Sequence, residues 1–124
     1  MGALTDQRQT LADDLAATGL MVYPAWPGRL DPPCIVLVPA LPWIDSRDVT
    51  FTHRRGHLSV HIFAGPGDAS DSLAALETAV ESVLVHSADW SIESVDAPTL
   101  VTLSGADYLA TTLNCSKPFR LPNP

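Results

Sequence analysis

The sequence predicts an α+β domain, in which a mostly antiparallel β-sheet carries two α-helices packed on one face. Two segments, residues 4–18 and 70–87, place apolar side chains at helical spacing, and several shorter segments are apolar or alternate with period two, as strands do. The elements follow the order helix, two strands, hairpin, helix and hairpin, which differs from the strand–helix alternation of a parallel sheet. The length of 124 residues fits a single domain over residues 1–124.

The first predicted helix spans residues 4–18. Leu11 and Leu15 are four residues apart and fall on one helical face. Thr5 or Asp6 can act as the N-cap by accepting a hydrogen bond from the first turn. A glycine directly follows the segment and suits the left-handed conformation that ends many helices. We therefore expect the helix to stop there.

Two predicted strands and two loops come next. Residues 20–23 (LMVY) form a short extended segment, and the proline-rich stretch 24–33 cannot be helical. Residues 34–39 (CIVLVP) are a continuous apolar run that is too short for a helix, so we expect a strand buried on both faces. Residues 40–45 (ALPWID) are predicted to be a loop that carries Trp43.

A β-hairpin is predicted around an arginine pair. Residues 48–53 (DVTFTH) and 57–63 (HLSVHIF) each alternate apolar and polar side chains, as half-buried strands do. Arg54, Arg55 and Gly56 lie between them, where a turn would connect the two strands. The sequence thus places both arginines at the tip of the hairpin.

The second predicted helix spans residues 70–87 and is the clearest element of the chain. The segment 65–67 (GPG) before it is typical of a turn. Asp68, Ser70 and Asp71 supply an N-cap and negative charge at the positive end of the helix dipole.

The last part of the chain predicts one strand, one hairpin and a tail. Trp90 and Ile92 open the strand, and residues 99–103 and 108–115 form the hairpin. Residues 117–124 (KPFRLPNP) are expected to form a proline-rich C-terminal tail without structure of its own.

The composition indicates an apolar, acidic protein. Hydrophobic residues make up 46% and charged residues only 17% of the chain, against about 25% charged in typical soluble domains. Either alanine and leucine are in chance excess, or a partner covers an apolar face; we favour the second. The net charge of −7 argues against a broad basic surface that grips nucleic acid.

Cysteine usage and the absence of an apolar targeting segment indicate the cytoplasm. The N-terminal segment lacks the apolar stretch of a secretory signal, and no apolar run approaches the roughly 18 residues of a membrane span. Cys34 and Cys115 are therefore expected to be reduced. A disulfide between them is the alternative.

Three of the four histidines, His53, His57 and His61, lie within the predicted hairpin. On one strand His57 and His61 share a face but stand about 13 Å apart, too far for one ion bound by both at about 2 Å. A cross-strand pair of His53 with His57 stays open. Otherwise we expect solvated or interface histidines and no metal site.

No catalytic constellation is predicted. Ser59 is two residues from His57 and His61 on a strand, which is too far for a nucleophile–base pair, and the chain lacks a phosphate-binding loop. We expect no enzyme activity and no cofactor. Trp26 and Trp43 lie in proline-rich loops, where they either fold back onto the core or anchor an interface. The pair Arg54–Arg55 is either a solvated turn or a contact loop for phosphate or an acidic neighbouring subunit.

The order and lengths of these elements, together with several short motifs, resemble those of the tail terminator (tail-completion) proteins of long-tailed bacteriophages, especially phages of actinobacteria. The segments that carry the resemblance are PCIVLVP at 33–39, PW at 42–43, HLSVHIF at 57–63, LAALETAVESVL at 73–84 and YLATT at 108–112. The resemblance spans nearly the whole chain, although none of these motifs is a catalytic signature.

The resemblance implies a virion protein of the tail and neck, assembled in the cytoplasm of the bacterial host. Such proteins form a homo-oligomeric ring, usually a hexamer, that caps the tail tube, ends its polymerisation and provides the surface for head attachment. The implied partners are the tail-tube protein, a head-completion or connector protein, and DNA that passes through the lumen without specific binding. No cofactor, catalytic centre or membrane is implied. Our own expectation is that the interface or lumen includes the following residues: Arg54, Arg55, His57, His61, Trp26 and Trp43.

Three alternatives stay open. The chain could be a head-closure or head–tail connector protein, or a tail-tube subunit. It could be a small metal enzyme that uses His53, His57 or His61. It could also be a partner- or ligand-binding module that uses the loops of Trp26 and Trp43.

Overall fold

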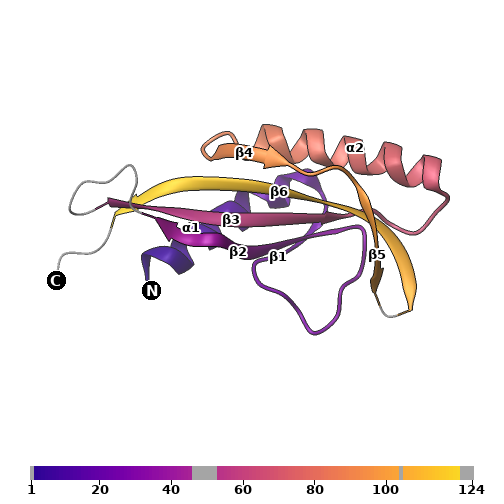
Figure 1. Ribbon diagram of the computed structural model, residues 1–124, viewed down its shortest axis with the longest axis horizontal. Helices are drawn as coiled ribbons and strands as arrows, with labels where there is room; N and C mark the ends of the chain where they lie inside the picture. The colour runs from indigo at the N-terminus through magenta and orange to yellow at the C-terminus, as the bar shows by residue number, and fades with distance from the viewer. Residues whose placement is uncertain (1, 46–52, 104, 121–124) are drawn as a thin grey trace.

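The computed structural model describes residues 2–45, 53–103 and 105–120 and shows an elongated sheet with two helices (Figure 1). Helix α1 spans Ala3–Leu15, is followed by the 3-10 turn η1 at Ala16–Thr18, and α2 spans Ala69–His86. The strands are β1 Met21–Tyr23, β2 Cys34–Asp45, β3 His53–Phe63, β4 Ser91–Val95, β5 Thr99–Leu103 and β6 Ala106–Arg120. The predicted α+β class is confirmed.

The described strands form one sheet in the order β1-β2-β3-β6-β4, and β5 pairs with β6 beside β4. The pairing of β1 with β2 is parallel, and every other pairing among the described strands is antiparallel. Residue Ala110 of β6 pairs with Phe63 on one side and Thr99 on the other. The long β6 therefore has β3 along one edge and shares its other edge between β4 and β5.

Both helices cover the same face of the sheet. Leu11 and Leu15 of α1 and Leu76 and Val83 of α2 are fully or almost fully buried in one apolar cluster with this face. The sheet contributes the following buried residues to that cluster: Ile35, Leu37, Leu58, Val60, Ile62, Leu113 and Cys115. The placement of the two helices on one face is thus as predicted.

The other face has a smaller apolar cluster near the proline-rich loop 24–33. Cys34, Val36, Phe63 and Ala110 form its buried centre. Strand β2 supplies alternate residues to the two clusters, so its first four residues are all buried. This alternation explains why the run CIVL is apolar throughout, and it confirms the prediction of a strand buried on both faces.

The helix ends agree with the predictions except at the first N-cap. Gly19 has φ of 82°, and the helical segment ends there as expected. Gly2, and neither Thr5 nor Asp6, occupies the N-cap position of α1. At α2 the carboxylate of Asp68 accepts a hydrogen bond from the backbone N–H of Asp71 at 2.9 Å, as predicted.

The predicted turn at Arg54, Arg55 and Gly56 is wrong. All three residues belong to β3, where they pair with β6. Gly56 serves close packing, since an added Cβ would lie 2.7 Å from Oε1 of Gln7 and 3.5 Å from the ring of Phe119. The first strand of the predicted hairpin falls on residues 48–53, of which 48–52 lie outside the described part of the chain.

Two further segments that were expected to lack regular structure belong to strands. Residues 40–45 are the second half of β2, and Lys117–Arg120 end β6 instead of starting a tail. Prolines mislead at both places for the same reason. Strand β1 pairs with β2 only as far as Val36, so the later part of β2 lies at the edge of the sheet. Strand β4 pairs with β6 only as far as Ser116, so Pro118 also lies at an edge. Proline is tolerated at such strand edges.

Candidate functional site

A row of polar side chains crosses the face of the sheet that the helices leave open. His57, Ser59 and His61 of β3 lie directly opposite Ser116, Asn114 and Thr112 of β6. Ser59 Oγ donates a hydrogen bond to Asn114 Oδ1 at 3.0 Å, and Nδ1 of His61 lies 2.8 Å from Thr112 Oγ1. Hydrogen bonds of this kind between directly opposite side chains fix the register of two strands.

His57 is the centre of a buried ionic cluster. Its Nε2 atom lies 2.6 Å from Oδ2 of Asp45, and its Nδ1 atom lies 2.9 Å from Oε1 of Glu93. His57 is 5% exposed. The cluster thus links β2, β3 and β4 through the two ring nitrogens of His57.

Two irregularities of the sheet bring the carboxylates to His57. In β4 the register shifts between Ile92, which pairs with Cys115, and Ser94, which pairs with Asn114, so that Glu93 is the extra residue. In β2 the register shifts between Pro39 and Ile44, just before Asp45. Bulges of this kind re-aim side chains at the edges of sheets.

The geometry of this cluster differs from that of a metal site. The two carboxylates occupy different nitrogens of the ring and do not converge on one point together with it. Within the described residues, no three His, Cys, Asp or Glu side chains form a group that could hold a metal ion. The proposed cross-strand pair of His53 and His57 is wrong, because both residues belong to β3.

His57 is also not the solvated histidine that the alternating pattern suggested, because Asp45 and Glu93 enclose it. They lie 12 and 36 residues away from it in the sequence. No local pattern marks either carboxylate as its partner. The sequence shows only that His57 is a polar residue at the start of an alternating strand. The β-bulges that bring the two carboxylates to it are visible only in the structure.

His61 occupies a different environment on the same strand face. Burial lowers the pKa of His61 below its ordinary value of 6.5, against the smaller opposing effect of the Asp96 carboxylate. The ring of Trp26 lies edge-on to it, with the ring centroids 6.3 Å apart. We infer that His61 is neutral near pH 7 and belongs to the packing of this face.

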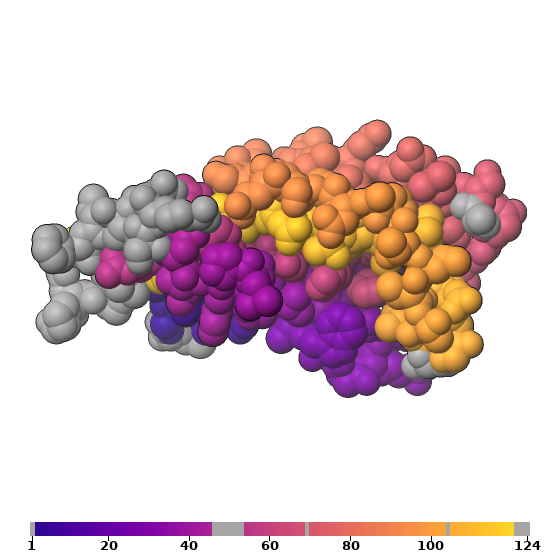
Figure 2. All heavy atoms as spheres, in the orientation of Figure 1, coloured from indigo at the N-terminus to yellow at the C-terminus, as the bar shows by residue number. Residues whose placement is uncertain are grey.

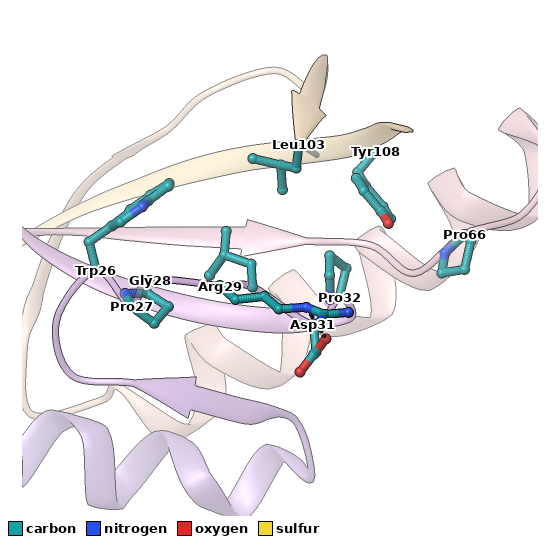
Figure 3. A pocket seen from close by; sticks show the side chains of 10 residues that line it. Trp26, Pro27, Gly28, Arg29, Asp31, Pro32, Pro66, Leu103 and Tyr108 are labelled. Carbon is teal, nitrogen blue, oxygen red and sulfur yellow. Dashed lines mark ion pairs between the residues drawn. The ribbon is translucent and has the colours of Figure 1, made fainter. Parts of the chain in front are cut away.

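The loop of Trp26 folds over the open face and leaves two hollows beside it. Trp26 contacts His61 and Phe63 with its ring edge while remaining 55% exposed. One hollow, of about 290 Å³, separates the loop from Leu103 and Tyr108 (Figure 3). The other, of about 320 Å³, lies between Trp26 and the β5–β6 hairpin. Trp26 thus both packs onto the sheet and presents an aromatic surface.

Trp43 lies in β2 and not in a loop. It is 45% exposed, and its neighbour Leu41 is 99% exposed. Both belong to the part of β2 between the pairs Pro39–Leu58 and Ile44–Gly56, where the strand has additional residues. The structure therefore does not bring Trp26 and Trp43 together, because Trp26 packs against the open face at His61.

The arginine pair lies near the end of β3 that pairs with the last residues of β6. Arg55 Nη1 donates a hydrogen bond to Ser116 Oγ at 2.9 Å. Arg54 pairs with Phe119, so the side chains of the two arginines extend from opposite faces of the sheet. Lys117 and Arg120 of β6 and Arg8 of α1 lie near the same end of the molecule.

No protein-family model matches the chain, and the comparison with curated proteins gives no match either. Within the described residues, no helix is long and apolar enough to cross a membrane.

Proposed function

We propose that this protein is a structural component of a bacteriophage neck, a tail terminator that caps the tail tube as a ring. In this role it ends polymerisation of the tube and provides the surface to which the head attaches. The proposal is supported by the resemblance of the chain to tail terminator proteins and by the distribution of exposed apolar side chains over the structure.

The observation that carries the proposal is the presence of two apolar surfaces at opposite ends of the sheet. Leu41, Trp43 and Ile44 of β2 are exposed at one end. Leu73 of α2 and Leu100 of β5 are exposed at the other. A head-to-tail ring needs two different surfaces on each subunit, one for each neighbour, whereas a two-fold dimer needs only one.

The charge and the sites of the chain are consistent with this role. The net charge of −7 suits a ring through which DNA passes without being held. Arg54, Arg55, Trp26 and Trp43 then belong to the interface or the lumen, and not to a catalytic centre, whereas His57 is buried within the sheet and His61 packs against Trp26. Both nitrogens of His57 are engaged by carboxylates, which disfavours the alternative of a metal enzyme at this residue.

The test uses the purified protein alone and mixed with the tail-tube protein of the same genome. We expect native mass spectrometry and electron microscopy to show closed rings of one size, and the tubes to stop growing when the protein is added. Continued elongation of the protein into tubes would identify a tail-tube subunit instead. A protein that leaves tube length unchanged and binds only a head connector would contradict the proposal and identify a head-closure protein.

A further inference from the structure

Two exposed apolar surfaces of the molecule differ in form, since one protrudes and the other is hollow. One, which we call the knob, consists of Leu41, Trp43 and Ile44 of β2. The other, which we call the hollow, is lined by Leu73 of α2, Pro98, Leu100 of β5 and Leu109 of β6. Strand β2 runs toward one end of the described sheet and β5 lies at the other (Figure 1), and Figure 2 shows all atoms in the same orientation.

The knob protrudes because β2 has more residues than its partner strand. Between the pairs Pro39–Leu58 and Ile44–Gly56, residues 40–43 of β2 face the single residue 57 of β3. The strand must therefore bulge outward, and β1 does not cover it, because its pairing with β2 ends at Val36. Leu41 at the top of the bulge is 99% exposed. A large apolar side chain held away from the body of the protein is suited to insert into a partner.

The hollow is large and apolar enough to receive these side chains. Its volume is about 570 Å³, within the range of about 300–1,000 Å³ that accommodates organic ligands larger than a single side chain. Leu100 in its wall is 70% exposed and Leu73 is 41% exposed. If a neighbouring molecule covered these side chains, each Å² of apolar surface removed from water would contribute about 25 cal/mol to the free energy of association.

Charge is divided between the same two ends. The segment from Gly56 to Ser116 contains no Lys or Arg. It supplies Asp107, which lines the hollow, and Asp68 and Asp71, which are adjacent in sequence to the lining residues Gly67 and Ser72. The basic residues at the knob end are Arg8, Arg54, Arg55, Lys117 and Arg120. Acidic side chains are present there too, namely Asp6, Asp45, Asp89 and Glu93, of which Asp45 and Glu93 contact His57.

We propose that the knob of one copy of this protein seats in the hollow of the next copy, with the basic end of the first against the acidic end of the second. The inference rests on the proposed ring and specifies which surfaces form it. A two-fold contact between two knob ends or two hollow ends would place like charges opposite each other, whereas a head-to-tail contact pairs unlike charges and repeats around a ring.

The test is a cysteine cross-link between Leu41→Cys and Leu100→Cys in one chain. The native Cys34 and Cys115 are buried, and burial raises their pKa values to about 11 and about 12, so neither competes for oxidation. Mild oxidation should give a ladder of covalent oligomers on a denaturing gel that ends at the size of the ring. The matched control combines Leu41→Cys with Val85→Cys, another exposed position, and should give no ladder.

A second pair of variants tests the contact without chemistry. Leu41→Asp and Leu100→Asp should each weaken self-association about tenfold or more, measured by light scattering. Val85→Asp should leave it unchanged. All three positions are exposed, so circular dichroism should show an intact fold for each variant.

The outcomes separate this inference from the proposed function when the protein is studied alone and with the tail-tube protein. If the protein forms rings but the two cysteines do not cross-link, the knob-in-hollow contact is overturned and the proposed ring still stands. Cross-linked open filaments that do not stop tube growth support the contact and contradict a terminator. Cross-linking no greater than in the control, under all conditions, overturns the contact. If the cysteine introduced at position 41 is protected from oxidation only when the tail-tube protein is present, the contact between copies is also overturned. The knob then binds the tail-tube protein.

Discussion

Strand β3 separates two surfaces that are held together in different ways. On one side Leu58, Val60 and Ile62 are buried under the two helices. On the other side His57, Ser59 and His61 form hydrogen bonds to neighbouring strands, and the proline-rich loop covers only part of them. The same strand thus contributes to an apolar core on one face and to a polar network on the other.

The difference shows how the sheet obtains both stability and a specific strand order. Each fully buried aliphatic side chain contributes about 1.5–3 kcal/mol, whereas a typical hydrogen bond contributes about 0.5–1.5 kcal/mol net. Apolar packing tolerates many arrangements, but the bonds of His57 require β2, β3 and β4 in one register. We therefore expect the helix-covered face to determine how stable the fold is and the open face to determine which register forms.

The largest effect should come from the helix-covered face. Leu113 is fully buried between the helices and the sheet. Leu113→Ala should lower the free energy of unfolding by about 2–5 kcal/mol, because it removes apolar contacts and leaves a cavity. Urea unfolding followed by circular dichroism measures the loss. Val85→Ala at an exposed position is the control and should stay within about 0.5 kcal/mol of the wild type.

A smaller loss should follow from the ionic cluster of the open face. His57→Ala leaves the carboxylates of Asp45 and Glu93 without their shared donor, and should cost about 1–3 kcal/mol in the same urea experiment. Ser59→Ala, two residues along the same face, removes one neutral hydrogen bond and should cost about 0.5–1.5 kcal/mol. If His57→Ala cost no more than Ser59→Ala, the cluster would not hold the strands together as we describe.

The smallest effect should be a pH dependence from His61. Its pKa is lowered in the folded protein, so the unfolded chain binds a proton more readily. The stability associated with neutral His61 is therefore present above pH 6.5, the ordinary value, and is lost as the pH falls through the window between that value and the lowered pKa. His61→Asn keeps a polar group near Thr112 and removes the titration.

Urea unfolding of the wild type and of His61→Asn between pH 8 and pH 5 measures this effect. The wild type should lose more stability than the variant over that range, and the difference in stability between them should become independent of pH above pH 7. Parallel losses in the two proteins would show that groups other than His61 account for the pH dependence.

Much of the fold follows from local patterns in the sequence. Leu11, Leu15 and the apolar stripe of residues 70–87 predict the two helices, and the run at 34–39 predicts a strand buried on both faces. These predictions are confirmed because burial on a regular element leaves a periodic pattern, whatever its partner.

The predictions that are wrong concern places where a distant partner decides the structure. Arg54, Arg55 and Gly56 have the composition of a turn, but β6 extends far enough to pair with them, and Gly56 packs closely against Gln7 and Phe119. Prolines suggested irregular structure at residues 40–45 and 117–120, although an unpaired strand edge accepts them.

The candidate site was the least predictable part of the molecule. The alternating pattern places His57 on the correct face of β3, but its carboxylates come from β2 and β4 through two register shifts that no sequence pattern reveals. The prediction that the chain functions as a terminator remains a prediction, which the ring and cross-linking experiments address.

The placement of β6 has a consequence for the order in which the chain can fold. Of the five strand pairings described, three involve this strand. A ribosome that has synthesised the chain only as far as Leu103 has made both helices and five of the described strands, yet β4 and β5 have nothing to pair with. In the nascent polypeptide β1, β2 and β3 can pair, but β4, β5 and one edge of β3 stay uncovered until residues 106–120 emerge, which makes this interval a period of exposure to chaperones and to aggregation.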